Sequence, residues 1–308
     1  MDFDLRPGIY VVAVSGGVDS MALLHQLHSR LLIDRKASDG DIESGMVLTV
    51  AHFDHGIRPD SVEDRRFVGE VAKSYGLPFV FDAGDLGSSA SEATAREARY
   101  DFLEKVMKYS KADGLITAHH QDDMLETAII NILRGTGRKG LTSLKSSHKL
   151  IRPLLGMSKA DIIKYAKLNN VEWREDSTNL ETKYLRNYVR QQIIIKFSKD
   201  DKKKFISHID DLKLVNNEID ENLRDHLDIH PSSDKLDRHW FIMLPHIVAR
   251  EVMVGWLRSH QVENIDKQQV ERLLHAAKTL QVGKKISVDK QRYININKEY
   301  LALDKHER

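Results

Sequence analysis

Most of the side chains that could do chemistry lie in four short segments of the sequence. The first, SGGVDS at 15–20, combines two glycines with two hydroxyls and a carboxylate. The second and third, AHFDHGIR at 51–58 and TAHHQDDMLET at 117–127, gather histidines and acidic residues. The fourth, DSTNLETKYLRNYVR at 176–190, ends in arginines. These residue types indicate a site for phosphate groups, a divalent metal ion and a cationic substrate.

The glycine segment joins a strand, predicted over residues 9–14, to a helix that begins near Asp19. Glycines let the backbone approach a ligand closely, and the first N–H groups of a helix lack intrahelical acceptors. Together they suit an anion, most often a phosphate. Asp19 is placed to meet a phosphate-bound Mg²⁺. Because no lysine follows the glycines, this is not the G-x-x-x-x-G-K-[ST] loop. The candidate phosphate-binding residues are Ser15, Gly16, Gly17, Val18, Asp19 and Ser20.

The two segments rich in histidine and acid each follow a predicted strand. Open α/β sheets bind ligands outside the carboxyl ends of their strands, so both segments should share one crevice with the glycine segment. We expect Asp122, Asp123 and Glu126 to bind magnesium and a cationic substrate. A dinuclear metal hydrolase is an alternative, because histidines and carboxylates are ligands for many divalent metals. The glycine segment would then have no purpose.

Two groups of arginines fall at helical spacing. Arg96, Arg99 and Tyr100 share one face of a predicted helix, and Arg186 and Arg190 lie on neighbouring turns of another. Arginines bind phosphates through bidentate contacts. Periodicity alone favours a solvated helix face for each group.

The segment GTGRKG at 135–140 formally matches the dinucleotide fingerprint G-x-G-x-x-G. It follows a predicted helix and not a strand, so the context of a Rossmann site is missing. A basic loop that contacts phosphate, with Arg134, Arg138 and Lys139, is the better interpretation.

Strand-like and helix-like segments alternate through the first half of the chain, which predicts an α/β fold with a doubly wound, mostly parallel sheet. Each predicted strand is nearly all apolar, as expected when helices cover both faces. A helical connector and a small α+β region should follow, the latter with helices over 240–260 and 267–280. We expect three parts: a catalytic domain at 1–198, the connector at 199–235 and a small accessory domain at 236–308.

Composition narrows the possible functions. The 308 residues contain 41% hydrophobic residues and no cysteine, which excludes disulfides, iron–sulfur clusters and a cysteine nucleophile. A net charge of +1 gives no general attraction to nucleic acid, so any RNA binding must use local patches. No stretch approaches the ~20 apolar residues of a membrane span, and the cytoplasm is the expected location.

Taken together, these motifs resemble those of the N-type ATP pyrophosphatases and, within them, the tRNA(Ile)-lysidine synthetases. The matching elements run in family order from Ser15 to Arg190. They are SGGVDS, AHFDHGIR, the Glu-Ala…Ala-Arg…Arg-Tyr-x-Phe-Leu helix, TAHHQDD–ET, LRGTG–GL, RPLL and D-S-T-N…R-N-x-x-R.

The resemblance implies a reaction and its participants. The family uses ATP to adenylate the C2 oxygen of the wobble cytidine in the CAU anticodon of tRNA(Ile), releasing pyrophosphate. The amine of free L-lysine then displaces AMP and leaves lysidine, which pairs with A. The implied cofactors are ATP and Mg²⁺, the implied partners are tRNA(Ile) and lysine, and many relatives are thought to be homodimers.

The resemblance also implies roles for individual residues. Asp123 and Glu126 would bind the lysine, and Asp19 and Asp122 the metal ion. His52 would join the glycine segment in binding ATP. Four residues, Arg58, Arg96, Arg99 and Tyr100, would position the tRNA or the adenylate. The catalytic set is Asp19, Asp123, Glu126, Arg186 and Arg190.

Three alternatives remain open at this stage. A related tRNA-thiolating enzyme would depend on cysteines, which are absent here. A small-molecule amidating ligase would share SGGxDS but not the other two motifs. A tRNA-binding protein with a relic nucleotide site would have lost Asp19, Asp123 and Glu126, which are intact.

Overall fold

A computed structural model describes residues 5–37, 45–56, 61–84, 92–175, 185–226, 235–262 and 265–305. The chain forms two compact units, Met1–Asp210 and Asp211–Arg308. None of the helices in these ranges is long and apolar enough to cross a membrane.

The first unit contains a five-stranded parallel sheet in the order β3-β2-β1-β4-β5. Its strands are β1 (Gly8–Ala13), β2 (Met46–Asp54), β3 (Phe79–Ala83), β4 (Gly114–Ile116) and β5 (Leu150–Ile151). The chain reverses its direction of winding after β3, when it returns to pair β4 with β1. The carboxyl ends of β1 and β4 therefore lie at the switch point, where α/β sheets bind ligands.

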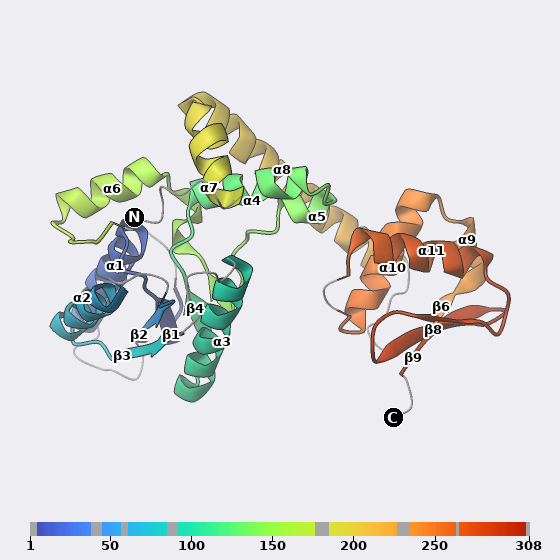
Figure 1. Ribbon diagram of the computed structural model, residues 1–308, viewed down its shortest axis with the longest axis horizontal. Coiled ribbons are helices and arrows are strands. Elements are labelled where there is room, and N and C mark those ends of the chain that lie inside the picture. Colours follow the sequence, from blue (N-terminus) through green and yellow to red (C-terminus); the bar gives the residue numbers. More distant parts are fainter. Residues whose placement is uncertain are drawn as a thin grey trace. The chain divides into compact units, whose positions relative to one another are not determined.

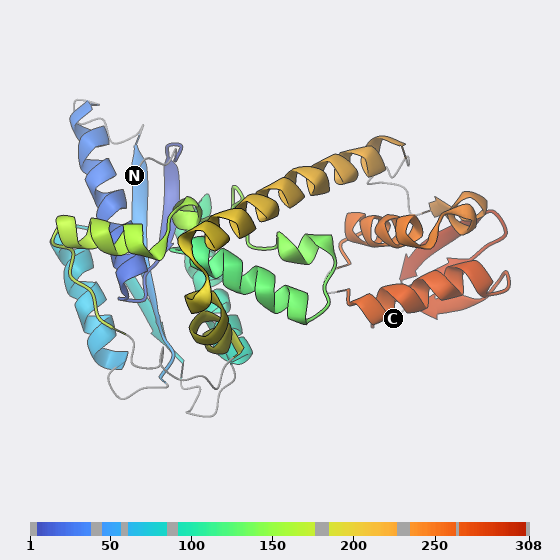
Figure 2. The same cartoon turned by 90° about the horizontal axis from the view of Figure 1, so that it is seen from above.

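Helices cover both faces of this sheet, as Figures 1 and 2 show. Helices α1 (Val18–Ala37), α2 (Ser61–Ser74) and α6 (Lys159–Leu168) pack on one face, where Val12 and Leu24 are fully buried. Helix α3 (Glu92–Ser110) packs on the other face through Phe102 and Leu103 against Val11. Alternate residues of β1 thus enter different cores, which explains its unbroken apolar sequence. The predicted doubly wound α/β fold is confirmed.

One strand does not follow the predicted pattern. We expected every strand to be covered on both faces, but most of β3 is exposed, with Phe81 at 50% and Val80 at 39%. The reason is its position, because β3 is the last strand at one edge of the sheet.

The remaining helices of the first unit form a separate layer with its own core. Helix α4 (Gln121–Leu133) buries Leu125 against Val189 and Ile194, and helix α5 (Arg138–Leu141) follows it. A single helix is expected over 184–197. Instead α7 (Leu185–Tyr188) leads into a π-helical turn, Val189–Ile193, and a 3₁₀ turn, Ile194–Lys196. Helix α8 (Lys199–His226) then forms the first part of the predicted connector, 199–235.

The second unit packs helices against an antiparallel sheet. Its strands are β6 (Lys235–Asp237), β7 (Lys285–Ser287), β8 (Arg292–Ile296) and β9 (Tyr300–Lys305), in the order β6-β9-β8-β7. The helix expected over 240–260 is two helices, α9 (Arg238–Met243) and α10 (His246–Ser259), because Pro245 interrupts it. With α11 (Lys267–Thr279) they enclose a core around Phe241 and Trp256.

Candidate active site

The glycine segment forms a tight loop between β1 and α1. Gly16 has a φ of +96°, a conformation that residues with a Cβ rarely adopt. The Ser20 hydroxyl accepts hydrogen bonds from the N–H groups of Ser15 and Gly16, both at 3.2 Å, and donates to the carbonyl of Gly17 at 3.0 Å. Beyond this loop the first N–H groups of α1 have no intrahelical acceptor. The loop therefore leads into a helix start whose backbone donors suit a phosphate.

Arg174 holds the loop against helix α2. Its backbone N–H donates to the carbonyl of Gly16 at 3.0 Å. Its guanidinium donates to Asp64 at 2.5 Å and to Glu63 at 2.8 Å, both in the first turn of α2. One arginine thus ties the conformation of the glycine loop to a helix that follows the next strand. Arg174 was not predicted, although it lies only two residues before the segment that begins at Asp176.

His52 lies directly behind the loop, at the end of β2. Its ring is 3% exposed, and Nδ1 donates to the carbonyl of Val14 at 2.8 Å. Burial lowers the pKa of His52, so the imidazole is neutral and supports the end of β1. The neighbouring Asp54 is also buried and accepts from the N–H of Gly56 at 2.9 Å. Arg58 lies outside the described residues.

The segment after β4 starts helix α4 with a reciprocal cap. The ring of His120 accepts at Nδ1 from the N–H of Asp122 at 3.2 Å, and Asp123 accepts from the N–H of His120 at 2.9 Å. The apolar start of the segment 114–120 predicts a strand over its length, but β4 ends at Ile116 and residues 117–120 lead into this cap. Because Nδ1 of His120 accepts this hydrogen bond, Nε2 is the ring nitrogen that carries a proton.

His120 Nε2 connects the glycine loop to the acidic helix. It lies 3.7 Å from a carboxylate oxygen of Asp19 and 3.6 Å from one of Asp123. The imidazole is almost completely buried, whereas the two carboxylates keep 27% and 17% of their side-chain surface exposed. Two of the predicted segments therefore meet at this one ring, as expected from their positions at the carboxyl ends of β1 and β4.

The surroundings of Asp123 favour its ionised form. Burial alone would raise the pKa of this carboxyl, but His120, the hydrogen bond from the backbone N–H of His120 and Arg190 hold the pKa below its ordinary value. Burial lowers the pKa of His119 itself to about 3, so its ring is neutral near pH 7. His119 lies 2.9 Å from the hydroxyl of Thr117. A neutral His119 can serve as a hydrogen-bonding partner in the crevice.

Glu126 is completely buried and bound to an arginine. Its two oxygens accept from Arg190 at 2.5 and 3.1 Å, and Arg186 lies 3.6 Å away. Burial raises the pKa of Glu126, and the hydrogen bonds from Arg190 act in the opposite direction. Arg190 also lies 3.6 Å from Asp123. The structure thus brings together Asp123, Glu126, Arg186 and Arg190, from two separate segments of the sequence.

Each of the two carboxylates predicted to bind metal has a lysine partner. Lys159, at the start of α6, donates to both oxygens of Asp19 at 2.7 and 2.6 Å. Lys202, in α8, donates to Asp122 at 3.1 and 3.2 Å. Neither lysine was singled out from the sequence. Within the described ranges, no three histidine, aspartate or glutamate side chains lie close enough to form a metal-binding group.

The predicted arginine face of α3 is formed around one aromatic ring. The guanidinium carbons of Arg96 and Arg99 lie 4.8 and 5.6 Å from the centroid of Tyr100. The buried Arg152, 8% exposed, interacts with the same tyrosine. Burial lowers the pKa of Arg152, whereas Tyr100 and Asp123 raise it. Arg152 was not predicted, although it begins the quoted motif RPLL.

The basic loop at 135–140 follows α4 as expected. Gly135 has a φ of +66°, and Asn131 donates to the carbonyl of Gly140 at 2.7 Å, which closes the loop onto α4. Arg138 and Lys139 lie in the short helix α5. The context is helix–loop–helix, and the Rossmann interpretation is excluded for this segment.

Comparisons with known proteins agree with this architecture. A family model described as a PP-loop domain matches residues 5–197. The chain is 38% identical over 200 residues to a tRNA(Ile)-lysidine synthase of Thermotoga maritima, covering 62% of this chain and 45% of that protein. It is 35% identical over 211 residues to a bifunctional protein TilS/HprT of Listeria monocytogenes, covering 65% of this chain and 31% of that protein.

The chain therefore spans less than half the length of these curated relatives. Among solved structures it resembles the U34-tRNA thiolase NcsA of Methanococcus maripaludis, solved with its 4Fe-4S cluster. The TM-score is 0.51 at 16% identity, covering 68% of this chain and 73% of that one. This likeness concerns the fold alone.

Proposed function

The chain belongs to the PP-loop domain family, which implies the use of ATP, and on this premise we propose that it ligates lysine to tRNA(Ile). The reaction is that of the tRNA(Ile)-lysidine synthetases. ATP activates the C2 oxygen of the wobble cytidine in the CAU anticodon, and L-lysine replaces the activated oxygen. The products are lysidine, AMP and pyrophosphate.

One observation carries this proposal. Asp19 of the glycine loop and Asp123 of α4 both lie within 3.7 Å of His120 Nε2. A nucleotide bound at the loop and an ammonium group bound at Asp123 would be neighbours in one crevice. That arrangement suits a reaction in which an amine attacks a group that ATP has just activated, because both reactants are already positioned.

The glycine loop and the start of α1 provide the site for ATP. Gly16 supplies the positive φ of the loop, a Cβ at Gly17 would meet only the Ser15 hydroxyl, and Arg174 ties the loop to α2. Asp19 is the carboxylate best placed for Mg²⁺, which often takes one or two carboxylates and completes its shell with phosphate oxygens and water. When bound, the ion would neutralise charge on the phosphates. Asp122 remains a second proposed ligand, although Lys202 holds it in the structure.

Asp123 and Glu126 form the proposed lysine site. Asp123 is ionised and partly exposed, so it can accept charge-assisted hydrogen bonds from an ammonium group. Glu126 has no exposed side-chain surface and both of its oxygens are on Arg190. It therefore supports the site through Arg190 in the conformation described here.

The two chemical steps use these groups in sequence. The cytidine oxygen attacks the α-phosphate of ATP and pyrophosphate leaves, a transfer in which positioning and charge neutralisation supply most of the rate. The lysine amine then attacks C2, gives up a proton and expels AMP. Arg186 and Arg190 lie beside the acidic pair and would stabilise the phosphate charge.

The tRNA would reach this crevice across the face formed by Arg96, Arg99 and Tyr100, with Arg152 beside it. We assign residues 1–198 to the catalytic domain, 199–235 to the connector and 236–308 to an accessory domain that contacts tRNA. A cytoplasmic location and a homodimer are part of the same proposal.

The test is a turnover assay with ATP, lysine and an unmodified CAU-anticodon tRNA(Ile) transcript. We expect release of AMP and pyrophosphate that depends on both lysine and tRNA, and no release with a transcript whose wobble cytidine is replaced. Turnover without tRNA would instead indicate a small-molecule ligase. Tight tRNA binding without turnover would indicate a relic nucleotide site.

A further inference from the structure

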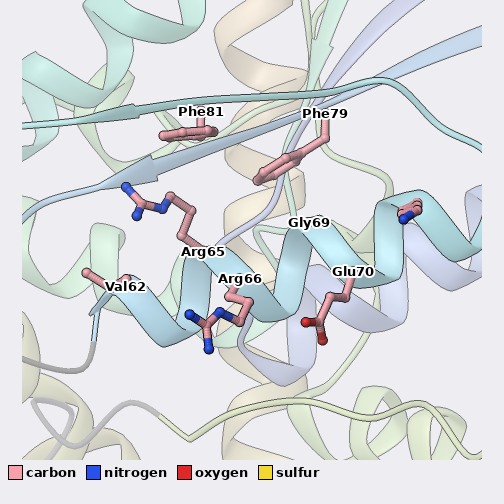
Figure 3. A pocket seen from close by; sticks show the side chains of 8 residues that line it. Val62, Arg65, Arg66, Gly69, Glu70, Phe79 and Phe81 are labelled. Atoms are coloured by element: carbon pink, nitrogen blue, oxygen red, sulfur yellow. The ribbon is translucent and has the colours of Figure 1, made fainter.

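A groove of about 410 Å³ lies between α2 and the edge strand β3, outside the candidate active site. Figure 3 shows it from close by. In this view Arg65 extends from α2 toward the ring of Phe81, and Phe79 points toward Gly69. The side chains of Arg66 and Lys73 also line the groove.

The groove follows from the position and sequence of β3. As an edge strand it has no neighbour in the sheet on its outer side, and α2 covers it only in part. Phe79 and Phe81 are two residues apart, so they share one face, and their rings stack at 5.8 Å. A Cβ at Gly69 would lie 3.0 Å from the Phe79 ring. The glycine therefore makes room for one phenylalanine and leaves the other open.

Phe81 and Arg65 form an exposed flat platform. Phe81 is 50% exposed, and the guanidinium of Arg65 lies 4.7 Å from its ring centroid. Aromatic rings and arginine planes are the surfaces on which unpaired bases stack in proteins that bind single-stranded nucleic acid. The platform is thus a chemical match for a base.

The charge around this platform is positive. Three cations, Arg65, Arg66 and Lys73, line the groove with the single carboxylate of Glu70. The two acids nearest the start of α2, Glu63 and Asp64, are both paired with Arg174. An anionic partner is therefore favoured over a cationic one.

The platform is next to the candidate active site within the same unit. Phe81 pairs in register with His52, whose ring supports Val14 just before the glycine loop. The groove therefore begins at the carboxyl end of the sheet, at β3, with β2 between it and the strand β1 that carries the loop. A polynucleotide in the crevice could continue into it.

We propose that this groove binds an unpaired nucleotide of the RNA substrate, with its base stacked on Phe81 and Arg65 and its phosphate near Arg66 and Lys73. The proposal rests on the proposed function, because it supplies the RNA. A peptide that adds a strand to β3 is another occupant such an edge can accept. The excess of cations and the arginine–phenylalanine stack favour the nucleotide.

The experiment measures binding of a fluorescent CAU anticodon stem–loop to the full chain by anisotropy, over a series of salt concentrations. Stacking on an aromatic residue contributes ~1–3 kcal/mol per base, so Phe81→Ala should weaken binding about tenfold. Phe81→Trp should retain the affinity. Arg65→Glu should weaken binding, and Lys73→Glu should reduce the dependence on salt by about one phosphate contact.

Matched controls are available on α3 of the same unit. Tyr109 is 94% exposed and lies beside the exposed Lys108, near the end of α3. This end of α3 leads into the amino end of β4, whereas the crevice lies at the carboxyl ends of the strands. Tyr109→Ala and Lys108→Glu should leave binding unchanged. Circular dichroism of each variant confirms that it is folded.

Several results would overturn the proposal. The first is wild-type RNA affinity in both Phe81→Ala and Arg65→Glu. The second is that these variants lose self-association in sedimentation but keep RNA binding, which would assign the groove to a second copy of the chain. The assay does not require catalysis. If the wild-type chain transfers lysine but Phe81→Ala keeps its KM for tRNA, only the groove proposal fails. If it transfers no lysine but Phe81→Ala loses RNA affinity, only the proposed function fails.

Discussion

The ammonium of Lys159 lies 2.7 and 2.6 Å from the two carboxylate oxygens of Asp19. A cation from the start of α6 thus occupies the carboxylate that the proposed mechanism assigns to magnesium. The two residues are 140 positions apart, so only the fold brings them together. The pair provides a direct test of Asp19 as the proposed magnesium ligand.

Replacing Lys159 with methionine should reduce the Mg²⁺ concentration needed for half-maximal ATP turnover, because ammonium and metal ion compete for one carboxylate. Lys159 is 38% exposed, so solvent screens it, and we expect a decrease of about threefold to tenfold. A magnesium titration at fixed ATP measures this value. Lys164→Met, on the exposed side of the same helix, is the control. An unchanged or higher magnesium requirement in Lys159→Met would show that Asp19 does not bind the ion.

The two glycines of the loop should respond differently to alanine. Gly16 has a φ of +96°, so Gly16→Ala should lower the free energy of unfolding by about 1–2 kcal/mol. A Cβ at Gly17 would lie 3.7 Å from the Ser15 hydroxyl, an ordinary contact, so Gly17→Ala should fold normally. It should nonetheless raise the KM for ATP about tenfold or more, because the methyl group would face the phosphates. Equal ATP affinity in Gly17→Ala and wild type would place the nucleotide elsewhere.

The fold was predictable wherever the chain's own periodicity determines it. Buried strands such as β1 show continuous apolar runs, and the capping serine before α6 marks its start. The exposure of β3 could not be predicted, because its sequence is apolar and only its place at the sheet edge leaves it open. The helical break before His246 does have a signal in the sequence, because Pro245 cannot continue the helix.

Stability should depend on pH through His119. Its folded pKa, about 3, is lower than the ordinary value of about 6.5, so the unfolded chain binds a proton more readily. Stability from this residue is fully present above about pH 6.5 and is lost as the pH falls toward 3. Between about pH 6.5 and 5 the wild-type chain should lose roughly 1 kcal/mol per pH unit more than His119→Gln in urea unfolding. Parallel pH profiles for both proteins would contradict this assignment.

Removing Arg190 should leave the buried Glu126 carboxylate without its main partner. Breaking a fully buried pair costs about 3–5 kcal/mol, and because Arg190 is 39% exposed we expect about 2–3 kcal/mol for Arg190→Met. The loss of Arg190 also raises the pKa of Glu126 further above its ordinary value. The defect should therefore be larger at pH 7 than at pH 5, because the raised pKa favours the protonated form of Glu126 as the pH falls. Denaturant unfolding at both pH values measures the defect, with the double variant Glu126→Gln/Arg190→Met for comparison. A loss of stability in Arg190→Met that does not change with pH would contradict this prediction.

The candidate site was predictable in its acidic and glycine-rich parts and not in the cations that surround them. Asp19 and Asp123 belong to motifs whose residue types indicate their chemistry. Lys159, Arg174 and Lys202 carry no such signal, because a lysine or arginine on a polar helix or loop is usually solvated. Their roles depend on distances between elements, and those distances exist only after the sheet and helices have assembled.

The most direct test of the central claim is mass spectrometry of the nucleosides in tRNA(Ile) after incubation with the chain, ATP and lysine. We expect lysidine in place of the wobble cytidine with the wild-type chain. We expect none with Asp123→Asn, which keeps the cap of α4 but loses the carboxylate charge for the ammonium. An unchanged cytidine with the wild-type chain, under conditions in which ATP is converted to AMP and pyrophosphate, would contradict the account.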